Sequence, residues 1–288
     1  MTENTADAVQ PENKKQASPA KELVDQGLNE LMMTLKKGKS DALLRYLAML
    51  AKFHRYSFSN VLLIWSQCPQ ATYVAGYQRW KQLRRFVKRG EKGILILAPI
   101  VSRKKDDNGK SKESDDDNSE VVVRFRSVYV FDVAQTEGAA LAEFAEVKGD
   151  PTIYLQRLKD FIAAGGITLN HDDVPSGADG VARKNRIGIR EELPPAKKFA
   201  VLVHELAHVQ LHFGENRPVS KTVRETEAEA VAFVVGRAIG LETNTAASDY
   251  IQLYDGKCET LLASLDRIQR VAGEIIVAIA DEEDLLSR

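Results

Sequence analysis

Residues 200–213 read A-V-L-V-H-E-L-A-H-V-Q-L-H-F and contain an H-E-x-x-H pattern that runs from His204 to His208. The apolar residues around this pattern predict a buried helix. At 3.6 residues per turn, His204 and His208 project from one face, one turn apart, so both can bind the same zinc ion. Glu205 lies about 100° round the helix, within reach of a water on that zinc. The alternative is a helix whose histidines are only hydrogen-bonded.

A second predicted helix, from about Val223 to Ile239, offers a third metal ligand. Glu225 and Glu229 are four residues apart and therefore share a face. Sixteen residues separate His208 from Glu225, which is enough for the chain to turn back and bring the two helices together. Two histidines and a glutamate, with the fourth position left to water, are the ligand set of gluzincin metallopeptidases. We therefore expect one Zn²⁺ ion on His204, His208 and Glu225.

The remaining polar residues of the two helices receive other roles. Glu229 is expected to accept a hydrogen bond from a ligand histidine, and it is the next candidate ligand if Glu225 is not one. Glu227 lies nearly opposite Glu225 on the helix, which predicts a solvent-facing side chain. His212 does not have the spacing of the third metzincin histidine, so we expect it to be structural or pocket-lining.

The segment from Lys52 to Lys105 is strongly basic. It holds twelve lysines and arginines and one acid, Glu91, for a local charge of +11, although the whole chain carries −1. Aromatic residues are interleaved with the basic ones. Basic groups bind phosphates and aromatic faces stack on unpaired bases, so the mixture is typical of a single-strand binder. The alternative is aromatic residues in a core beneath a solvated charged face. The candidate DNA-binding residues are Arg55, Tyr56, Trp80, Arg84, Arg85, Lys88, Arg89 and Lys92.

Composition limits the cellular context. The polar residues 1–21 contain no apolar signal-peptide core and predict a disordered tail. No apolar run approaches 18 residues, so we expect no membrane span and no membrane partner. Cys68 and Cys258 lie far apart, which favours a reduced, cytoplasmic protein. The oligomeric state stays open.

Three stretches resemble the N-terminal domain of ArdC-type antirestriction proteins. They are Tyr56–Asn60 (Y-S-F-S-N) with the region of Trp80, Val87–Gly93 (V-K-R-G-E-K-G) and Val130–Gly138 (V-F-D-V-A-Q-T-E-G). The second half resembles the zincin-like domain of the same proteins, which is related to ImmA/IrrE metallopeptidases. There, a helix with E-x-x-A follows H-E-x-x-H, and Glu225 and Ala228 match it. The resemblance implies a single-stranded-DNA-binding domain joined to a metallopeptidase-like domain, and an association with plasmids or other mobile elements.

We therefore expect an α+β protein of two domains. Residues 22–137 would form the DNA-binding α+β domain, with two strands, 94–100 and 121–131, paired as a hairpin around an acidic, flexible insertion at 104–120. Residues 138–150 would be a connection, and residues 151–288 a mainly helical zincin-like domain with a small sheet. In that sheet, residues 186–190 are expected to form an edge strand that pairs with an extended substrate.

The expected activity is zinc-assisted hydrolysis of a protein or peptide. Zinc would polarise the scissile carbonyl and lower the pKa of its water, and Glu205 would take the proton and pass it to the leaving amine. One alternative is a non-catalytic DNA-binding antirestriction factor with a structural zinc site. Another is a regulatory protease that cleaves a repressor and is brought to DNA by its basic domain.

Overall fold

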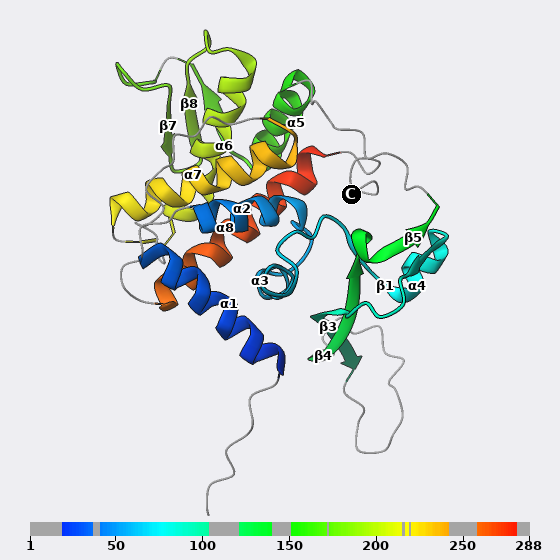
Figure 1. The fold of residues 1–288 in the computed structure, drawn as a ribbon. Helices are drawn as coiled ribbons and strands as arrows, with labels where there is room; N and C mark the ends of the chain where they lie inside the picture. Colours follow the sequence, from blue (N-terminus) through cyan, green and yellow to red (C-terminus); the bar gives the residue numbers. More distant parts are fainter. Residues whose placement is uncertain are drawn as a thin grey trace, which may run out of the picture.

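The computed structural model describes residues 19–36, 41–103, 121–139, 151–171, 173–214, 217–218, 220–241 and 258–280 (Figure 1). Residues 1–18 of the predicted tail at 1–21, the acidic insertion at 104–120 and most of the predicted connection at 138–150 lie outside these residues. Residues 19–21, which were also expected to belong to the disordered tail, are helical. Helices and three small sheets make up the described part, which confirms a mixed α+β fold.

Three helices open the described chain: α1 (Pro19–Lys36), α2 (Asp41–Lys52) and α3 (Phe58–Gln67). In α2, the side chains of Leu43, Tyr46, Leu47 and Leu50 recur at helical spacing, and all four are fully buried. Burial of this stripe, rather than intrinsic helix propensity, supplies most of the stability of such a helix.

An antiparallel sheet follows, with the strand order β1–β4–β3. Its strands are β1 (Val74–Gly76), β3 (Ile94–Arg103) and β4 (Val121–Asp132). The long β3–β4 pair confirms the predicted hairpin. The free edge of β3 faces α3, where the Asn60 amide pairs with the backbone N–H and C=O of Leu97, both at 2.8 Å. Gln67 does the same for Leu95, at 2.9 Å for each bond. Two amide side chains thus satisfy a strand edge that would otherwise be open to pairing.

A second, two-stranded sheet joins β2 (Arg85–Val87) to β5 (Thr136–Gly138), with α4 (Tyr77–Gln82) before it and the 3₁₀ turn η1 (Val133–Gln135) beside it. Gly138 has φ +130°, and a Cβ there would lie 2.5 Å from the carbonyl oxygen of Arg84. Only glycine fits this contact between the two short strands.

The C-terminal half begins with α5 (Pro151–Ala164) and a sheet of β6 (Thr168–Asn170), β7 (Gly180–Arg183) and β8 (Arg186–Ile189). The strand order is β6–β8–β7, so β8 is paired on both sides. The prediction of an edge strand at 186–190 is therefore wrong, because the short turn after β7 folds β8 into the middle of the sheet. Among the described strands, β7 is the edge strand that packs against the H-E-x-x-H helix.

Three long helices complete the fold: α6 (Pro195–His212), α7 (Lys221–Ala238) and α8 (Cys258–Ile279). Helix α7 lies between α6 and α8, and α2 from the N-terminal half packs against it (Figure 1). Buried side chains from α1, α2 and α3 form one continuous cluster with those of α5 to α8. The two-domain layout stays a prediction, and the helices of both predicted domains share a core.

Candidate metal centre and nucleic-acid surface

Helix α6 presents the H-E-x-x-H residues toward α7. It begins at Pro195, where a missing backbone N–H costs nothing. Phe199, Leu202 and Leu206 are fully buried and fix the rotation of the helix. His204 and His208 are thereby turned to the boundary with α7, where their side chains are 23% and 14% exposed.

The three predicted ligand atoms converge. Nε2 of His204 and Nε2 of His208 are 3.1 Å apart. Oε2 of Glu225 lies 3.6 Å from the first nitrogen and 3.3 Å from the second. Atoms bound tetrahedrally to one zinc ion at about 2.0–2.1 Å are separated by about 3.3–3.4 Å. The triangle therefore has the dimensions of a tetrahedral zinc site, and its N, N, O donors suit that ion.

Glu229 lies one turn beyond Glu225 and backs the first histidine. Its Oε2 is 3.4 Å from Nδ1 of His204, the ring nitrogen that faces away from the convergence point. A carboxylate at this nitrogen holds the proton on Nδ1 and leaves Nε2 free to bind a metal. The structure thus brings together the four residues that the sequence predicted as ligands and support.

Glu205 is nearly buried beside the cluster, and its carboxylate accepts a hydrogen bond from the backbone N–H of Ala182 in β7. It lines a cavity with His204 and Glu229. Apolar side chains of α6 and α7, including Val201 and Phe233, form the rest of the wall. A carboxylate at the edge of such a cavity can reach a bound water without being a metal ligand.

Burial and neighbouring charges change the protonation of these groups. Burial, together with the adjacent His204, lowers the pKa of His208 to about 4. Burial alone would also lower the pKa of His204, but the hydrogen bond to Glu229 and nearby carboxylates raise it above its usual value. Burial raises the pKa of Glu205. A raised pKa brings a carboxylate closer to the range in which a general base works efficiently.

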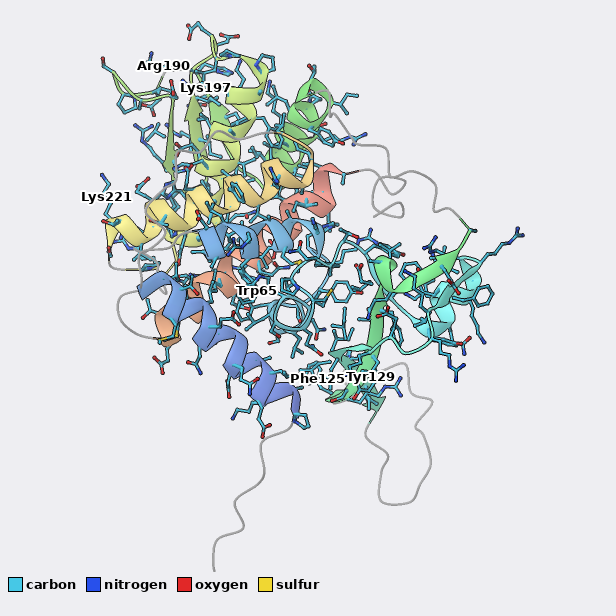
Figure 2. The ribbon with its side chains drawn as sticks, viewed as in Figure 1. Trp65, Phe125, Tyr129, Arg190, Lys197 and Lys221 are labelled. Atoms are coloured by element: carbon cyan, nitrogen blue, oxygen red, sulfur yellow. The ribbon has the colours of Figure 1, made fainter. Side chains whose placement is uncertain are left out.

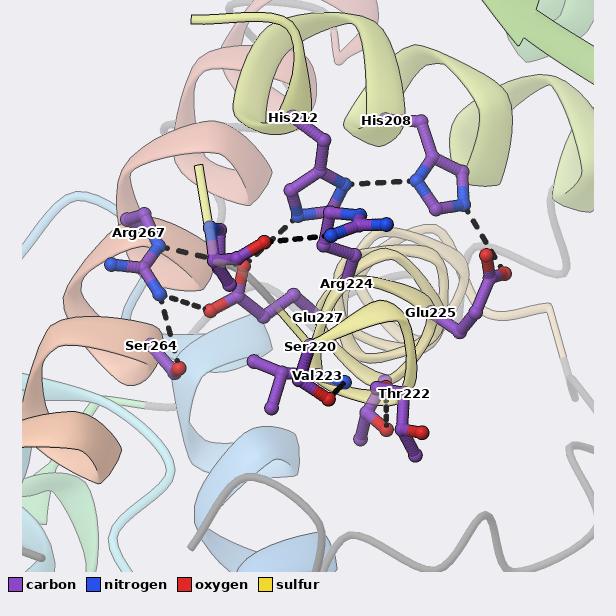
Figure 3. A network of polar contacts seen from close by, with 12 residues as sticks. His208, His212, Ser220, Thr222, Val223, Arg224, Glu225, Glu227, Ser264 and Arg267 are labelled. Atoms are coloured by element: carbon purple, nitrogen blue, oxygen red, sulfur yellow. Dashed lines mark hydrogen bonds and ion pairs between the residues drawn. The ribbon is translucent and has the colours of Figure 1, made fainter. Parts of the chain in front are cut away.

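Behind the cluster lies a buried polar network that the sequence interpretation missed (Figure 3). The prediction of a solvent-facing Glu227 is wrong, because this side chain is fully buried. It contacts His212 at 3.0 Å and forms an ion pair with Arg267 of α8. Although burial opposes ionisation, hydrogen bonds from His212, Arg267 and Ser264 lower the pKa of Glu227. His212 contacts Nδ1 of His208, whereas Nε2 of His208 belongs to the ligand triangle. His212 therefore lies outside this triangle.

One sequence signal pointed toward this network. His204, His208 and His212 are spaced by four residues and form a single stripe along α6. A third histidine on this face, His212, calls for a polar partner of its own on the facing helix. Glu225 and Glu229 are predicted from their shared helix face, and helical phase alone predicts the wrong side for Glu227.

The candidate DNA-binding residues divide into accessible and inaccessible ones. The prediction of Trp80 as a base-stacking residue is wrong, because its ring is fully buried and its Nε1–H donates to the carbonyl of Phe131. The Arg85 guanidinium donates to Thr136 and to the carbonyl of Ala139, which holds it against the chain. Tyr56 is half-buried. Exposed side chains among the candidates are Arg55, Arg84, Lys88, Arg89 and Lys92.

Other aromatic side chains take the exposed positions. Phe125 and Tyr129 of β4 are 66% and 61% exposed (Figure 2). They are four residues apart on one strand and so project from the same face of the sheet. Gly93 packs against Tyr129, so the basic loop of residues Lys88–Lys92, which directly precedes Gly93, ends next to this ring. The alternation of side chains along β4 predicts that Phe125 and Tyr129 share a face of the sheet. It does not predict whether that face is buried or exposed.

Known proteins resemble this chain in part of its sequence and in its fold. Residues 21–131 match the family model for the N-terminal domain of anti-restriction factor ArdC. The fold is similar to the metal-free crystal structure of antirestriction ArdC protein from plasmid R388, with a TM-score of 0.51 and 17% identity over 88% of this chain and 96% of that one. The Mn(II)-bound structure of the same protein gives a TM-score of 0.52 and 16% identity, over 90% and 99% of the two chains.

Two uncharacterized proteins are also similar. One, pXO2-81 of Bacillus anthracis, is 24% identical over 84% of this chain and 47% of its own length. The other, y4eC of Sinorhizobium fredii, is 26% identical over 53% of this chain and 51% of its own. The chain thus spans about half the length of the curated relatives that it matches.

The fold and the cluster define an α+β protein with a candidate H-E-x-x-H metal centre. Its residues 21–131 match the ArdC N-terminal domain, which confirms the resemblance inferred from the sequence for this part, and its fold is similar to that of an ArdC protein. Within the part of the chain that the structure describes, none of the helices has the length and apolar character needed to cross a bilayer.

Proposed function

We propose that this chain is an ArdC-type antirestriction protein that hydrolyses a protein or peptide at a divalent metal centre and binds single-stranded DNA. The observation that carries the hydrolytic part is the convergence of His204, His208 and Glu225 beside the buried carboxylate of Glu205. A purely structural zinc site has no need of such a carboxylate. The antirestriction role rests on the likeness to ArdC proteins.

The residues of the site have separate roles in hydrolysis. When bound, a divalent cation supplies Lewis acidity toward the scissile carbonyl and lowers the pKa of a water. Glu205 takes the proton from that water and passes it to the leaving amine. Glu229 holds His204 in the metal-binding tautomer. The donor set favours zinc, and the R388 protein is described with Mn(II).

Strand β7 is the element that supports binding of an extended peptide. It is an edge of its sheet and packs against α6, and Gly180 lies beside Glu205. A Cβ at Gly180 would approach the Glu205 side chain to 2.9 Å, so glycine keeps this end of the strand close to the carboxylate. A peptide added to β7 by backbone hydrogen bonds would run alongside the metal centre.

The Glu205→Gln variant tests the hydrolytic part. It should retain the metal content of the wild-type protein, because Glu205 is not a ligand, and lose about 10²- to 10⁴-fold in hydrolysis because the general base is gone. Metal content is measured on the purified protein, and cleavage on a proteome-derived peptide library by mass spectrometry. Glu225→Ala should lose the metal, whereas Glu274→Ala, which removes an exposed acid of α8, should keep it.

The same variant separates the alternatives. If protection of incoming DNA survives Glu205→Gln unchanged, the protein acts as a DNA-binding factor and hydrolysis is not the mechanism. If Glu205→Gln abolishes both the protection of DNA and the cleavage of one cellular regulator, the chain is a regulatory protease. If Glu205→Gln cleaves peptides as fast as the wild type, Glu205 is not the base.

The observation that favours DNA binding is that Phe125 and Tyr129 are both exposed on one face of β4, with Tyr129 next to the basic residues Lys88–Lys92. Stacking on one base contributes about 1–3 kcal/mol, so Tyr129→Ala should weaken binding of an oligothymidylate by about 5- to 150-fold. Lys92→Ala should lower the slope of log affinity against log salt by about 0.7 if the lysine contacts a phosphate. Both are measured by fluorescence anisotropy.

The control for this experiment is Phe213→Ala, which removes an exposed aromatic side chain outside the basic segment. It should leave the affinity unchanged. Equal affinities for the wild type, Tyr129→Ala and Phe125→Ala would show that nucleic acid does not bind on this face of β4.

A further inference from the structure

The two histidines of the candidate metal centre are supported in different ways. Nδ1 of His204 faces the carboxylate of Glu229 directly. Nδ1 of His208 faces another imidazole, because Nδ1 of His212 lies 2.8 Å away. Nε2 of His212 in turn lies 3.0 Å from Oε2 of Glu227. A chain of contacts therefore runs from the ligand triangle into the core (Figure 3).

The far end of this chain is tightly enclosed. The side chains of His212 and Glu227 are 3% and 0% exposed. Arg267 of α8 forms an ion pair with Glu227 and donates to Ser264 at 3.2 Å. A guanidinium can only donate hydrogen bonds, so it fixes Glu227 as a carboxylate that can only accept.

Hydrogen-bond chemistry gives this chain a direction. Because the Glu227 carboxylate only accepts, Nε2 of His212 must carry the proton between them. In a neutral imidazole the other nitrogen is then an acceptor, so Nδ1 of His212 accepts from Nδ1–H of His208. With its proton on Nδ1, His208 has a free lone pair on Nε2, the nitrogen that points to the ligand triangle.

We propose that Glu227, acting through His212 and held by Arg267, is a positioning residue that sets the metal-binding tautomer of His208. The inference rests on the proposed metal centre and adds three residues to it. Arg267 supplies the positive charge that balances Glu227, which lets His212 serve as a neutral link. The centre is thus tied to α8 as well as to α6 and α7.

The Glu227→Gln variant should reverse the direction of the hydrogen bonds that run from His208 through His212 to residue 227. Arg267 would take the amide oxygen, which leaves the amide NH₂ to donate to Nε2 of His212. His212 would then donate from Nδ1, His208 would accept at Nδ1, and the proton of His208 would move to Nε2. Long-range ¹H–¹⁵N spectra of the metal-free protein distinguish the two tautomers. We expect the Nδ1–H form of His208 in the wild type and the Nε2–H form in Glu227→Gln.

Zinc affinity provides the second readout. Loss of a supporting partner of a metal ligand costs about 10- to 100-fold in affinity, and we expect a loss of this size for Glu227→Gln in a chelator-competition titration with zinc. Glu274→Gln, on the exposed side of α8, should bind zinc like the wild type. Circular dichroism shows whether each variant is folded.

A pair of variants at His212 tests the link even if Glu227→Gln does not fold. In His212→Asn, the amide oxygen can take the place of Nδ1 and accept from His208, so zinc affinity should stay near the wild-type value. His212→Leu offers no acceptor and should lose about 10- to 100-fold. Glu227 keeps its Arg267 partner in both.

The outcomes separate this inference from the metal centre itself. If the wild-type protein does not bind zinc, the proposed metal centre is wrong. The tautomer of His208 in the metal-free protein still tests whether Glu227 acts on His208 through His212. If the wild type binds zinc but His212→Leu binds it equally well, or if His208 keeps its tautomer in Glu227→Gln, the positioning role is overturned.

Discussion

Tyr46 of α2 is a fully buried residue whose hydroxyl has no hydrogen-bond partner among the residues that the structure describes. Burial, with the charge of Asp266, raises its pKa well above the usual value. Because the folded-state pKa is the higher one, the ionisation of Tyr46 does not change the free energy of unfolding below the unfolded-state pKa of about 10. Above that pH the free energy of unfolding falls as the pH rises toward the folded-state pKa.

The Tyr46→Phe variant should therefore be more stable than the wild type by about 1 kcal/mol at neutral pH, because it no longer buries an unpaired hydroxyl. Above about pH 10 the advantage should grow, by up to about 1.4 kcal/mol per pH unit, as the unfolded wild-type chain ionises. Urea unfolding at pH 7 to 11 measures both effects. Tyr77→Phe, at an exposed ring, should change neither; a less stable Tyr46→Phe at pH 7 would reveal a partner for the hydroxyl.

Single residues also show the limit of composition as a guide to DNA binding. The interleaved aromatic and basic residues pointed to Trp80, which lies in the interior with its ring N–H satisfied by a backbone carbonyl. Phe125 and Tyr129 lie in the predicted strand 121–131, outside the basic segment, and they are exposed. Residue type predicts what a side chain can do, and only packing decides whether it is accessible.

At the scale of elements, α7 explains why Glu227 was misplaced. The helix packs against α6, α8 and α2, so it has buried residues on nearly every side, including Glu227, Ala228 and Ala230. An argument from helical phase needs one solvent-facing side, and α7 has little of one. Its acidic residues are compensated by polar partners on neighbouring helices instead.

The edge of β3 gives a prediction at the same scale. In Asn60→Ala, the backbone N–H and C=O of Leu97 lose their partners next to α3, which should destabilise the protein by about 2–3 kcal/mol. The opened edge should also promote association between chains. Thermal unfolding and light scattering measure these changes.

Ser59→Ala, at the neighbouring position of α3, is the matched control and should have little effect on either measurement. An Asn60→Ala protein as stable and monodisperse as Ser59→Ala would mean that the amide pairing is not what closes this edge.

The whole molecule is held together by α8, which contacts both halves of the chain. Gln269 of α8 donates to the backbone carbonyls of His54 and Tyr56, at 3.2 and 3.0 Å, in the turn between α2 and α3. The Arg157 side chain of α5 donates to the carbonyl of Ile279 near the end of α8. The helices that carry the candidate metal centre and those that precede the basic segment therefore share one core.

A fragment of residues 151–288 should consequently fail to fold alone. Without α2 and α3, it would expose apolar side chains of α7 and α8 that the full chain buries. We expect no cooperative thermal transition and no tight zinc binding from the fragment, and recovery of both when residues 1–150 are co-expressed. A fragment that unfolds cooperatively and binds zinc would instead establish the domain boundary that the sequence predicts.

The sequence by itself determined the features that depend on local periodicity. His204 and His208 share a face because of the helical repeat, Glu225 and Glu229 share one for the same reason, and the β3–β4 hairpin follows from two apolar strands. These patterns depend on the local backbone geometry and do not depend on which other elements a helix or strand packs against.

Only the tertiary structure decided the features that depend on neighbours. It buried Trp80 and Glu227, exposed Tyr129, placed β8 inside its sheet, and joined His208 through His212 to Arg267. Burial and hydrogen-bond partners are properties of pairs of elements far apart in the chain, and a single sequence records the two members of each pair without recording that they meet.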